Sequence, residues 1–427
     1  MTILVFALVA LAVCALLVLV HRWLWIRLVR DTTAPGAPTR RIGTALAIAL
    51  PLLSVAALTT GRAGAPFRLQ QTVAWPGYLW LAVLLYLTLT MLVAEPIRAL
   101  LLRRLAHRVP SRAVAGPPVP QTVPRAAAPE PAPEPAPAPV AAATAGPAAT
   151  GPALTRRRFV ARAVGGAAAA VAVGTVATGT YGVLRGPSVR RVQVPLAKLP
   201  RAAHGFRIAV VSDVHLGPVL GRAHAQRIVD TVNRTQPDLI AIVGDLVDGS
   251  VPDLGPAAEP LRRLAARHGS YFVTGNHEYF SGAQQWIDHV RELGLTPLEN
   301  ARRALPHFDL AGVNDIQGEP EGSGPDFQAA LGDRDRTRAA VLLAHQPVVI
   351  HDAVRHGVDL QLSGHTHGGQ LWPGNYLAEL ANPTVAGLER YGDTQLYVSR
   401  GAGAWGPPVR VGAPSDITVV ELASYQA

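Results

Sequence analysis

The chain has 427 residues, more than one ordinary domain needs, and 49% of them are hydrophobic, which favours membrane spans in at least one part. Its formal charge is +10, but residues 1–185 hold 18 arginines and 4 acidic residues (+14), whereas residues 186–427 hold 21 basic and 25 acidic residues (−4). The basic surplus lies outside the C-terminal half, which argues against a nucleic-acid partner there. The single cysteine, Cys14, excludes an intrachain disulfide.

Residues 1–108 are expected to form a membrane region with three transmembrane helices at about 3–20, 42–60 and 78–94. Each run approaches the roughly 20 apolar residues needed to cross a bilayer. Buried core helices of a soluble protein are the alternative, but arginine-containing loops separate the runs and disfavour it.

A linker and a fourth apolar segment follow. Residues 109–154 are rich in Pro and Ala, show no hydrophobic periodicity, and are interpreted as a semi-extended linker. Residues 155–185 combine the arginines of Thr155-Arg156-Arg157-Arg158-Phe159 with a weakly apolar run, which resembles a twin-arginine export signal. The twin-arginine translocase would then be a partner during export. An ordinary membrane helix with cytoplasmic arginines is the open alternative.

Arginine distribution predicts orientation through the positive-inside rule. The loop after the first span and the segment after the third are rich in arginine, and the loop after the second carries only Arg62 and Arg68. Four spans then place the C-terminal domain, residues 186–427, outside the cytoplasm.

That domain is expected to be α/β, because short apolar strands alternate with helical segments. Strands are predicted at 207–212, 238–243, 271–274, 339–344 and 358–362, and helices at 223–233, 257–267 and 284–293.

Chemistry-bearing side chains follow the strands, at the edge where α/β sheets hold ligands. In Ser212-Asp213-Val214-His215, the carboxylate and the imidazole at i and i+2 point the same way and can grip one metal ion. In Gly244-Asp245-Leu246-Val247-Asp248-Gly249, Asp245 ends an apolar strand, so its partly buried charge needs a positive partner. Asp248 also fits a helix cap.

Three more motifs come later in the chain. Asn276 and His277 lie in Gly-Asn-His-Glu, His345 opens His-Gln-Pro, and His365 and His367 form a His-x-His pair in Ser-Gly-His-Thr-His-Gly-Gly-Gln. The glycines let the backbone approach a metal centre closely. Each motif alone has an ordinary structural reading, but all five in this order and setting favour a metal site.

The five motifs resemble those of the calcineurin-like metallophosphoesterase superfamily, in particular its membrane-associated bacterial branch. Some members of that branch are exported by the twin-arginine route, and others act on the pyrophosphate of a UDP-linked diacylated sugar. The resemblance covers roughly residues 192–422 and leaves out the first three spans and the linker. It implies a metallophosphoesterase four-layer α-β-β-α sandwich with mixed sheets, here preceded by transmembrane helices. A single N-terminal anchor is more usual in the family, so the extra spans are a departure.

The resemblance also implies two metal sites. One ion would be held by Asp213, His215, Asp245 and His367, and the other by Asp245, Asn276, His345 and His365. Asp245 would bridge the ions, and His277 would sit beside the leaving group as the catalytic residue. Mixed imidazole, carboxylate and amide ligands suit Mn, Fe or Zn.

Other positions are weaker candidates. Asp248 and Glu278 are candidates to orient ligating histidines or to cap helices, and Arg410, in a Gly/Pro/Arg tail, is a candidate phosphate contact. Residues 371–388, which include Trp372 and Tyr376, would be either an apolar rim for a lipid-linked substrate or a loop packed on the core.

The expected function is a membrane-anchored phosphohydrolase in which two metals direct hydroxide attack on a phosphodiester, pyrophosphate or phosphomonoester, with a phosphorylated, membrane-associated substrate. One alternative is a non-catalytic membrane protein with a relic metal-binding domain, which would have lost ligands. Another is a nuclease of the same superfamily, which would carry basic residues around the site.

Overall fold

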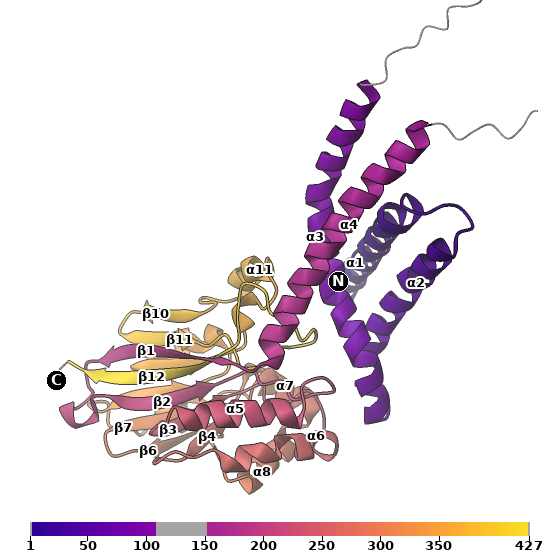
Figure 1. Cartoon of the computed structure of the whole chain (residues 1–427). Helices are drawn as coiled ribbons and strands as arrows, with labels where there is room; N and C mark the ends of the chain where they lie inside the picture. Colours follow the sequence, from indigo (N-terminus) through magenta and orange to yellow (C-terminus); the bar gives the residue numbers. More distant parts are fainter. Residues whose placement is uncertain (1, 108–151, 426–427) are drawn as a thin grey trace, which may run out of the picture. The chain divides into compact units, whose positions relative to one another are not determined.

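The structure is a computed structural model that describes residues 2–107 and 152–425. The predicted linker at 109–154 lies almost wholly outside these residues. The first part of the chain forms α1 (Thr2–Trp25), a π-helical turn (Ile26–Arg30), α2 (Pro38–Thr59) and α3 (Phe67–His107), and α4 (Pro152–Leu184) follows. All four α-helices are long and apolar enough to cross a membrane (Figure 1). The expected spans fall within them, and the arginine motif at 156–158 lies in the first turns of α4.

The chain divides into two compact units, and the boundary passes through α3 and α4. One unit contains Met1–Arg41 and Met91–Ala168; the other contains Ile42–Thr90 and Ala169–Ala427. Within the first unit, Arg27 forms ion pairs with Asp31 and Glu95 at 3.0 Å each, and Glu95 also pairs with Arg98 at 2.7 Å. These charges join the π-helical turn after α1 to α3 inside that unit.

The first sheet of the C-terminal domain has six strands in the order β1, β12, β2, β3, β4, β5. Strands β2 (Phe206–Val211), β3 (Leu239–Val243), β4 (Ser270–Val273) and β5 (Thr296–Pro297) run parallel. Strand β12 (Asp416–Ser424) is antiparallel to β2 and parallel to β1 (Ser188–Leu196).

The second sheet also has six strands, in the order β10, β11, β9, β8, β7, β6. Strands β7 (Phe308–Gly312), β8 (Ala339–Leu343), β9 (Leu360–Ser363) and β11 (Thr394–Val398) are parallel. The edge strands β6 (Ala301–Ala304) and β10 (Gly387–Tyr391) are antiparallel to their neighbours. Both sheets are therefore mixed.

Residue alternation along the strands separates an inner core from an outer one. In β3, Leu239, Ala241 and Val243 belong to the cluster shared with the second sheet, whereas Ile240 and Ile242 belong to the cluster under the helices. Because successive side chains point to opposite faces, a continuous apolar run is what a strand covered on both faces needs.

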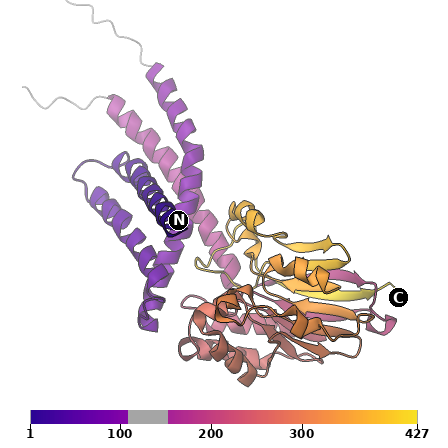
Figure 2. The same cartoon turned by 180° about the vertical axis from the view of Figure 1, so that it is seen from behind.

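Helices cover the outer face of each sheet. Helices α5 (Arg222–Arg234), α6 (Val251–Ala258) and α8 (Ala283–Glu292) contribute to the outer core of the first sheet, and Figures 1 and 2 show them on one side of its strands. Helices α9 (Phe327–Leu331) and α10 (Ile350–Arg355) contribute to the outer core of the second. The four-layer α-β-β-α architecture is confirmed. The remaining helices, α7 (Asn276–Ser281) and α11 (Gly374–Ala381), lie beside the site.

One predicted helix is misplaced. A helix was expected at 257–267. Helix α6 instead begins at Val251 and ends at Ala258, and a 3-10 turn at Glu259–Arg263 follows it. Ser250 precedes the first helical residue, with Pro252 in the opening turn, where proline is tolerated. This earlier start was not predicted from the sequence. Seven strands were also not predicted: β1, β5, β6, β7, β10, β11 and β12.

Candidate metal centre

Every predicted ligand lies at the carboxyl end of a parallel strand. Asp213 and His215 follow β2, Asp245 follows β3, and Asn276 follows β4. From the second sheet, His345 follows β8, and His365 and His367 follow β9. The carboxyl ends of parallel strands meet at one edge of a sheet, so the two packed sheets bring all seven residues to a common edge.

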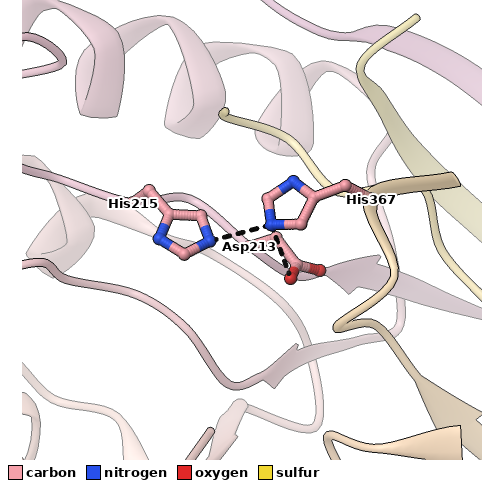
Figure 3. A group of neighbouring side chains, drawn as sticks. All are labelled: Asp213, His215 and His367. Carbon is pink, nitrogen blue, oxygen red and sulfur yellow. Dashed lines mark hydrogen bonds and ion pairs between the residues drawn. The ribbon is translucent and has the colours of Figure 1, made fainter. Parts of the chain in front are cut away.

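A first cluster consists of Asp213, His215 and His367 (Figure 3). The Nε2 atoms of His215 and His367 lie 3.0 Å apart, and His367 Nε2 lies 3.4 Å from Asp213 Oδ1. All three residues are buried. Their ligand atoms face a common point.

A second cluster consists of Asp245, His345 and His365, with Asn276 between the histidines. His345 Nε2 lies 3.2 Å from Asp245 Oδ2 and 3.1 Å from Asn276 Oδ1. His365 Nδ1 also lies 3.1 Å from Asn276 Oδ1. This is the predicted second ligand set.

Asp245 lies between the two clusters. Its Oδ2 atom is 3.2 Å from His345 Nε2 and 3.8 Å from His215 Nε2. Its other oxygen, Oδ1, accepts a hydrogen bond of 2.9 Å from the backbone N–H of His277, which fixes the carboxylate. One carboxylate thus faces both ligand sets.

Asp248 joins two histidines. Its Oδ1 atom lies 2.6 Å from His277 Nδ1 and 3.0 Å from His215 Nδ1. Helix α6 begins after Ser250, so the capping alternative for Asp248 does not apply. With Nδ1 of each ring on Asp248, Nε2 of each ring is directed at the cluster, and His277 Nε2 lies 4.0 Å from Asp245 Oδ2.

Glu278 supports the backbone instead of a histidine. It is fully buried and accepts hydrogen bonds from the backbone N–H groups of Asp245, Leu246 and Gly275, at 3.0, 2.8 and 2.6 Å. Burial, and then the nearby charge of Asp245, raises the pKa of Glu278 to about 7. Glu278 therefore ties the turn after β3 to the turn after β4.

Arg410 is buried behind His367. Its Nη1 donates to the carbonyl oxygens of His367 and Ala413, both at 3.0 Å, and its Nε donates to Gly403 O at 2.7 Å. Its Nη2 lies 3.1 Å from His367 Nδ1. Most of the guanidinium donors are engaged within the protein, so the structure favours a positioning role over the phosphate contact that the sequence suggested.

The backbone at the ligands is unusual. Five candidate ligands have positive φ: Asp213 (52°), His215 (49°), Asp245 (53°), His365 (73°) and His367 (52°). Only eight non-glycine residues in the described part of the chain do so. This conformation costs about 1–3 kcal/mol per residue and persists where the surroundings impose it, often at functional sites.

Glycines make room for the ligands at two positions. A Cβ atom on Gly364 would collide with Ser212 Oγ and Asp213 Oδ2, and one on Gly275 would collide with Asp245 Oδ1. A side chain at either position would displace a carboxylate.

Comparison with known proteins is consistent with this geometry. The family model of the calcineurin-like phosphoesterases matches residues 206–369. A metallophosphoesterase of uncharacterized function from Aquifex aeolicus is 33% identical over 239 residues, which cover 55% of this chain and 91% of that protein. The chain belongs to the calcineurin-like phosphoesterase family.

Two animal relatives add information about the membrane part. Proteins of Danio rerio and Bos taurus, each named a transmembrane protein with metallophosphoesterase domain, are both 40% identical, over 250 and 253 residues. Each match covers 55% of this chain and 57% of the relative, so it spans little more than half of those proteins. Their names and the four apolar helices support a membrane protein.

The electrostatics of this phosphoesterase site fit a bound cation. Burial raises the pKa of Asp213, and the nearby charge of His345 offsets this only in part. Burial would also raise the pKa of Asp245, but His345 and His215 outweigh it and hold that pKa well below its usual range. For His215, burial opposes the charge, yet Asp248 and Asp245 raise its pKa to about 9. Positive charge from protonated histidines thus balances the negative charge of the carboxylates. If divalent cations bound here, they would supply this positive charge and the histidines would lose their protons.

The other two histidines already favour the neutral form that binds metals. Burial, then His345, lowers the pKa of His365 to about 4, and burial, then His215 and Arg410, lowers the pKa of His367 well below its usual value. The oxygen and nitrogen donors fit Mn, Fe or Zn.

The sequence analysis missed the groups that surround His277. The rings of Phe280 and Trp405 lie edge-on to the His277 ring, with centroid distances of 5.6 and 5.7 Å. Trp405 comes from a loop 128 residues further along the chain, and no motif in the sequence linked it to the site. His224, in α5, is buried.

We predict that Gly364→Ala weakens metal binding, because the added methyl group displaces Asp213. Metal content of the purified chain, measured by plasma mass spectrometry after dialysis against Mn²⁺, should fall, and Gly221→Ala should match the parent, since a Cβ there meets no atom within 4 Å. Equal metal content in both variants would contradict the prediction.

Proposed function

We propose that this chain is a membrane-anchored, metal-dependent phosphohydrolase that works with two divalent cations. The arrangement of two ligand sets on either side of Asp245 supports this most directly. Asp213, His215, Asp245 and His367 would hold one cation, and Asp245, Asn276, His345 and His365 the other. When bound, such a cation pair acts as a Lewis acid on phosphoryl oxygens and lowers the pKa of water.

Within this proposal, His277 serves the leaving group. Its Nδ1 is bound to Asp248, whose pKa is held at about 2, against the effect of burial, by His215 and His277. Asp248 is therefore ionised at neutral pH, and its Oδ1 atom accepts a hydrogen bond from His277 Nδ1. The Nε2 atom on the cluster side is then placed to donate a proton to the departing oxygen.

The surroundings of the site favour a substrate in which the phosphoryl group carries one organic or phosphate substituent on each of two sides. Beside the second ligand set lies a cleft of about 460 Å³, lined by Asn276, Ile316, Gln317, Glu319, Pro320, Gln346 and His365. On the His277 side, Phe280 and Trp405 are 63% and 54% exposed. A polar recess and an aromatic wall suit a phosphodiester or a pyrophosphate better than a phosphomonoester.

The same surroundings speak against a nuclease, because the cleft lining contains no lysine or arginine to track a phosphate backbone. The relic alternative predicts lost ligands, whereas all seven side chains converge. The substrate that we favour is phosphorylated and membrane-associated, because a tether raises the effective concentration of such a substrate.

The membrane topology is also part of the proposal. From the arginine distribution we infer that the catalytic domain lies outside the cytoplasm, at the cell membrane. From the motif at 156–158 we propose the twin-arginine translocase as the export partner, with ordinary membrane insertion as the alternative.

We predict that the metal-depleted full chain regains hydrolysis of bis-p-nitrophenyl phosphate with Mn²⁺ and cleaves this diester faster than p-nitrophenyl phosphate. Asp245→Asn and His365→Ala should reduce the rate to that of the metal-free protein, since each removes a ligand. The control is His351→Ala, an exposed position on α10. Folded, metal-loaded protein without activity on either compound would count against the proposed hydrolase.

A second prediction concerns Asp248→Asn, which removes the charge that holds both His215 and His277. Loss of such an orienting carboxylate typically costs 10–100-fold in activity or metal affinity, and we expect a fall in kcat of about that size. Asp253→Asn, on the exposed first turn of α6, should leave kcat unchanged. An unaltered kcat in the Asp248 variant would exclude the orienting role.

A third prediction concerns orientation. Alkaline phosphatase, which is active only outside the cytoplasm, should be active when fused after Ala427. Replacing Arg156 and Arg157 with lysines should abolish that activity if the twin-arginine route is used, whereas ordinary membrane insertion would tolerate the change. An inactive fusion of the parent chain would overturn the orientation.

A further inference from the structure

Helix α11 and Trp372, two residues before it begins, present exposed apolar side chains. Trp372, Tyr376, Leu377 and Leu380 are 50%, 58%, 71% and 84% exposed. Positions 376 and 377 lie four and three residues before 380, so they share one side of the helix. These four residues are called the α11 apolar face below. Figure 1 shows α11 projecting beyond the strands of the second sheet.

This face does not pack on the protein core. None of its four residues belongs to a core cluster, which corrects the packed-loop alternative considered for residues 371–388. The only charged residue in α11 is Glu379, which lies about 160° around the helix from Leu377 but three positions from Tyr376, so it borders the apolar face. Large apolar side chains gathered on one exposed side mark an interaction surface.

The base of α11 is joined to segments of two candidate membrane spans in the same compact unit. Tyr86 of α3 donates a hydrogen bond of 3.0 Å to the carbonyl oxygen of Trp372. Trp372 N–H donates to Val411 O at 2.9 Å, and the neighbouring Arg410 N–H donates to Gly179 O of α4 at 3.4 Å. Gly179 lies so close that a Cβ there would approach Val409 Cγ1 to 2.7 Å.

We propose that the α11 apolar face inserts into the interfacial layer of the bilayer that these helices cross. The contacts with α3 and α4 favour lipid over a second protein as the occupant, because they hold α11 beside two helices that are long and apolar enough to cross a membrane. Tryptophan and tyrosine, which begin the face, are the side chains preferred at membrane interfaces. Since α11 carries no lysine or arginine, the attraction is apolar burial and does not require anionic lipid.

This placement has a consequence for access to the metal centre. Gly369, two residues after His367, packs directly against the backbone of Asn375 in α11. The ligand-bearing turn and the inserted helix are therefore one connected segment, and the site would open close to the lipid headgroups. The insertion itself does not depend on hydrolysis and is tested without it.

The test uses the full chain in nanodiscs of phosphatidylcholine, with Cys14→Ser as the background because Cys14 is the only native cysteine. Single variants Leu377→Cys and Leu380→Cys carry a nitroxide spin label, and power saturation compares collisions with oxygen, which concentrates in lipid, and with a water-soluble nickel chelate. Val18→Cys in α1 supplies the lipid reference. Asp333→Cys, whose native side chain is 83% exposed, supplies the water reference.

We expect the labels at 377 and 380 to shift towards the lipid reference. A label at Glu379→Cys, about 160° around the helix from Leu377, should lie closer to the water reference. This alternation would distinguish insertion from a general loss of accessibility. Labels at 377 and 380 that match the water reference, or that are shielded from both reagents as in a protein interface, would overturn the proposal.

Discussion

Burial of the carboxylates of Asp213 and Asp245 is the constraint on which the rest of the site depends. Both side chains lie at the ends of strands that are apolar on both faces, where an unbalanced negative charge is costly. Among the residues that the structure describes, no lysine or arginine forms an ion pair with either carboxylate, although the charge of Arg410 acts on Asp213. Histidines surround them instead, and these can carry protons or give them up to bind metal. The site is therefore built for a positive charge that the folded chain supplies only by protonation.

The geometry that meets this constraint is imposed by the backbone. Five ligands occupy the left-handed region, and glycines at 275 and 364 leave space that side chains would fill. Glu278 binds three backbone N–H groups and locks the turns after β3 and β4 together. The local strain is thus supported by two well-packed cores, one between the sheets and one beneath α5, α6 and α8.

The C-terminal end of α4 packs directly on loops of the phosphoesterase domain. The last turns of α4 pack Val183 and Leu184 against Leu220 and Ala404, near the loop that carries Trp405. Arg410 donates hydrogen bonds to His367. The preceding residue, Val409, packs against Gly179 of α4. In the second compact unit, the end of a candidate span is thereby connected through one buried arginine to a candidate ligand.

The sequence by itself determined the candidate ligands, the alternation of strands and helices, and the apolar runs. These features are local: a motif such as Gly-His-Thr-His-Gly identifies its own turn, and an apolar run of 18 residues predicts its own helix. The main error at this level, the helix expected at 257–267, came from reading apolar spacing without the proline-containing start at 251.

Tertiary structure alone decided which groups support the ligands. Asp248 was an equally good helix cap until the fold brought it to both His215 and His277, and Arg410 looked like a phosphate contact until burial engaged its donors with His367 and nearby carbonyl groups. Exposure of the α11 apolar face was likewise undetermined, since apolar residues after a ligand turn fit a packed loop equally well. The physical reason is that hydrogen-bond partners and burial depend on contacts between residues far apart in the chain, and those contacts exist only once the two sheets have packed.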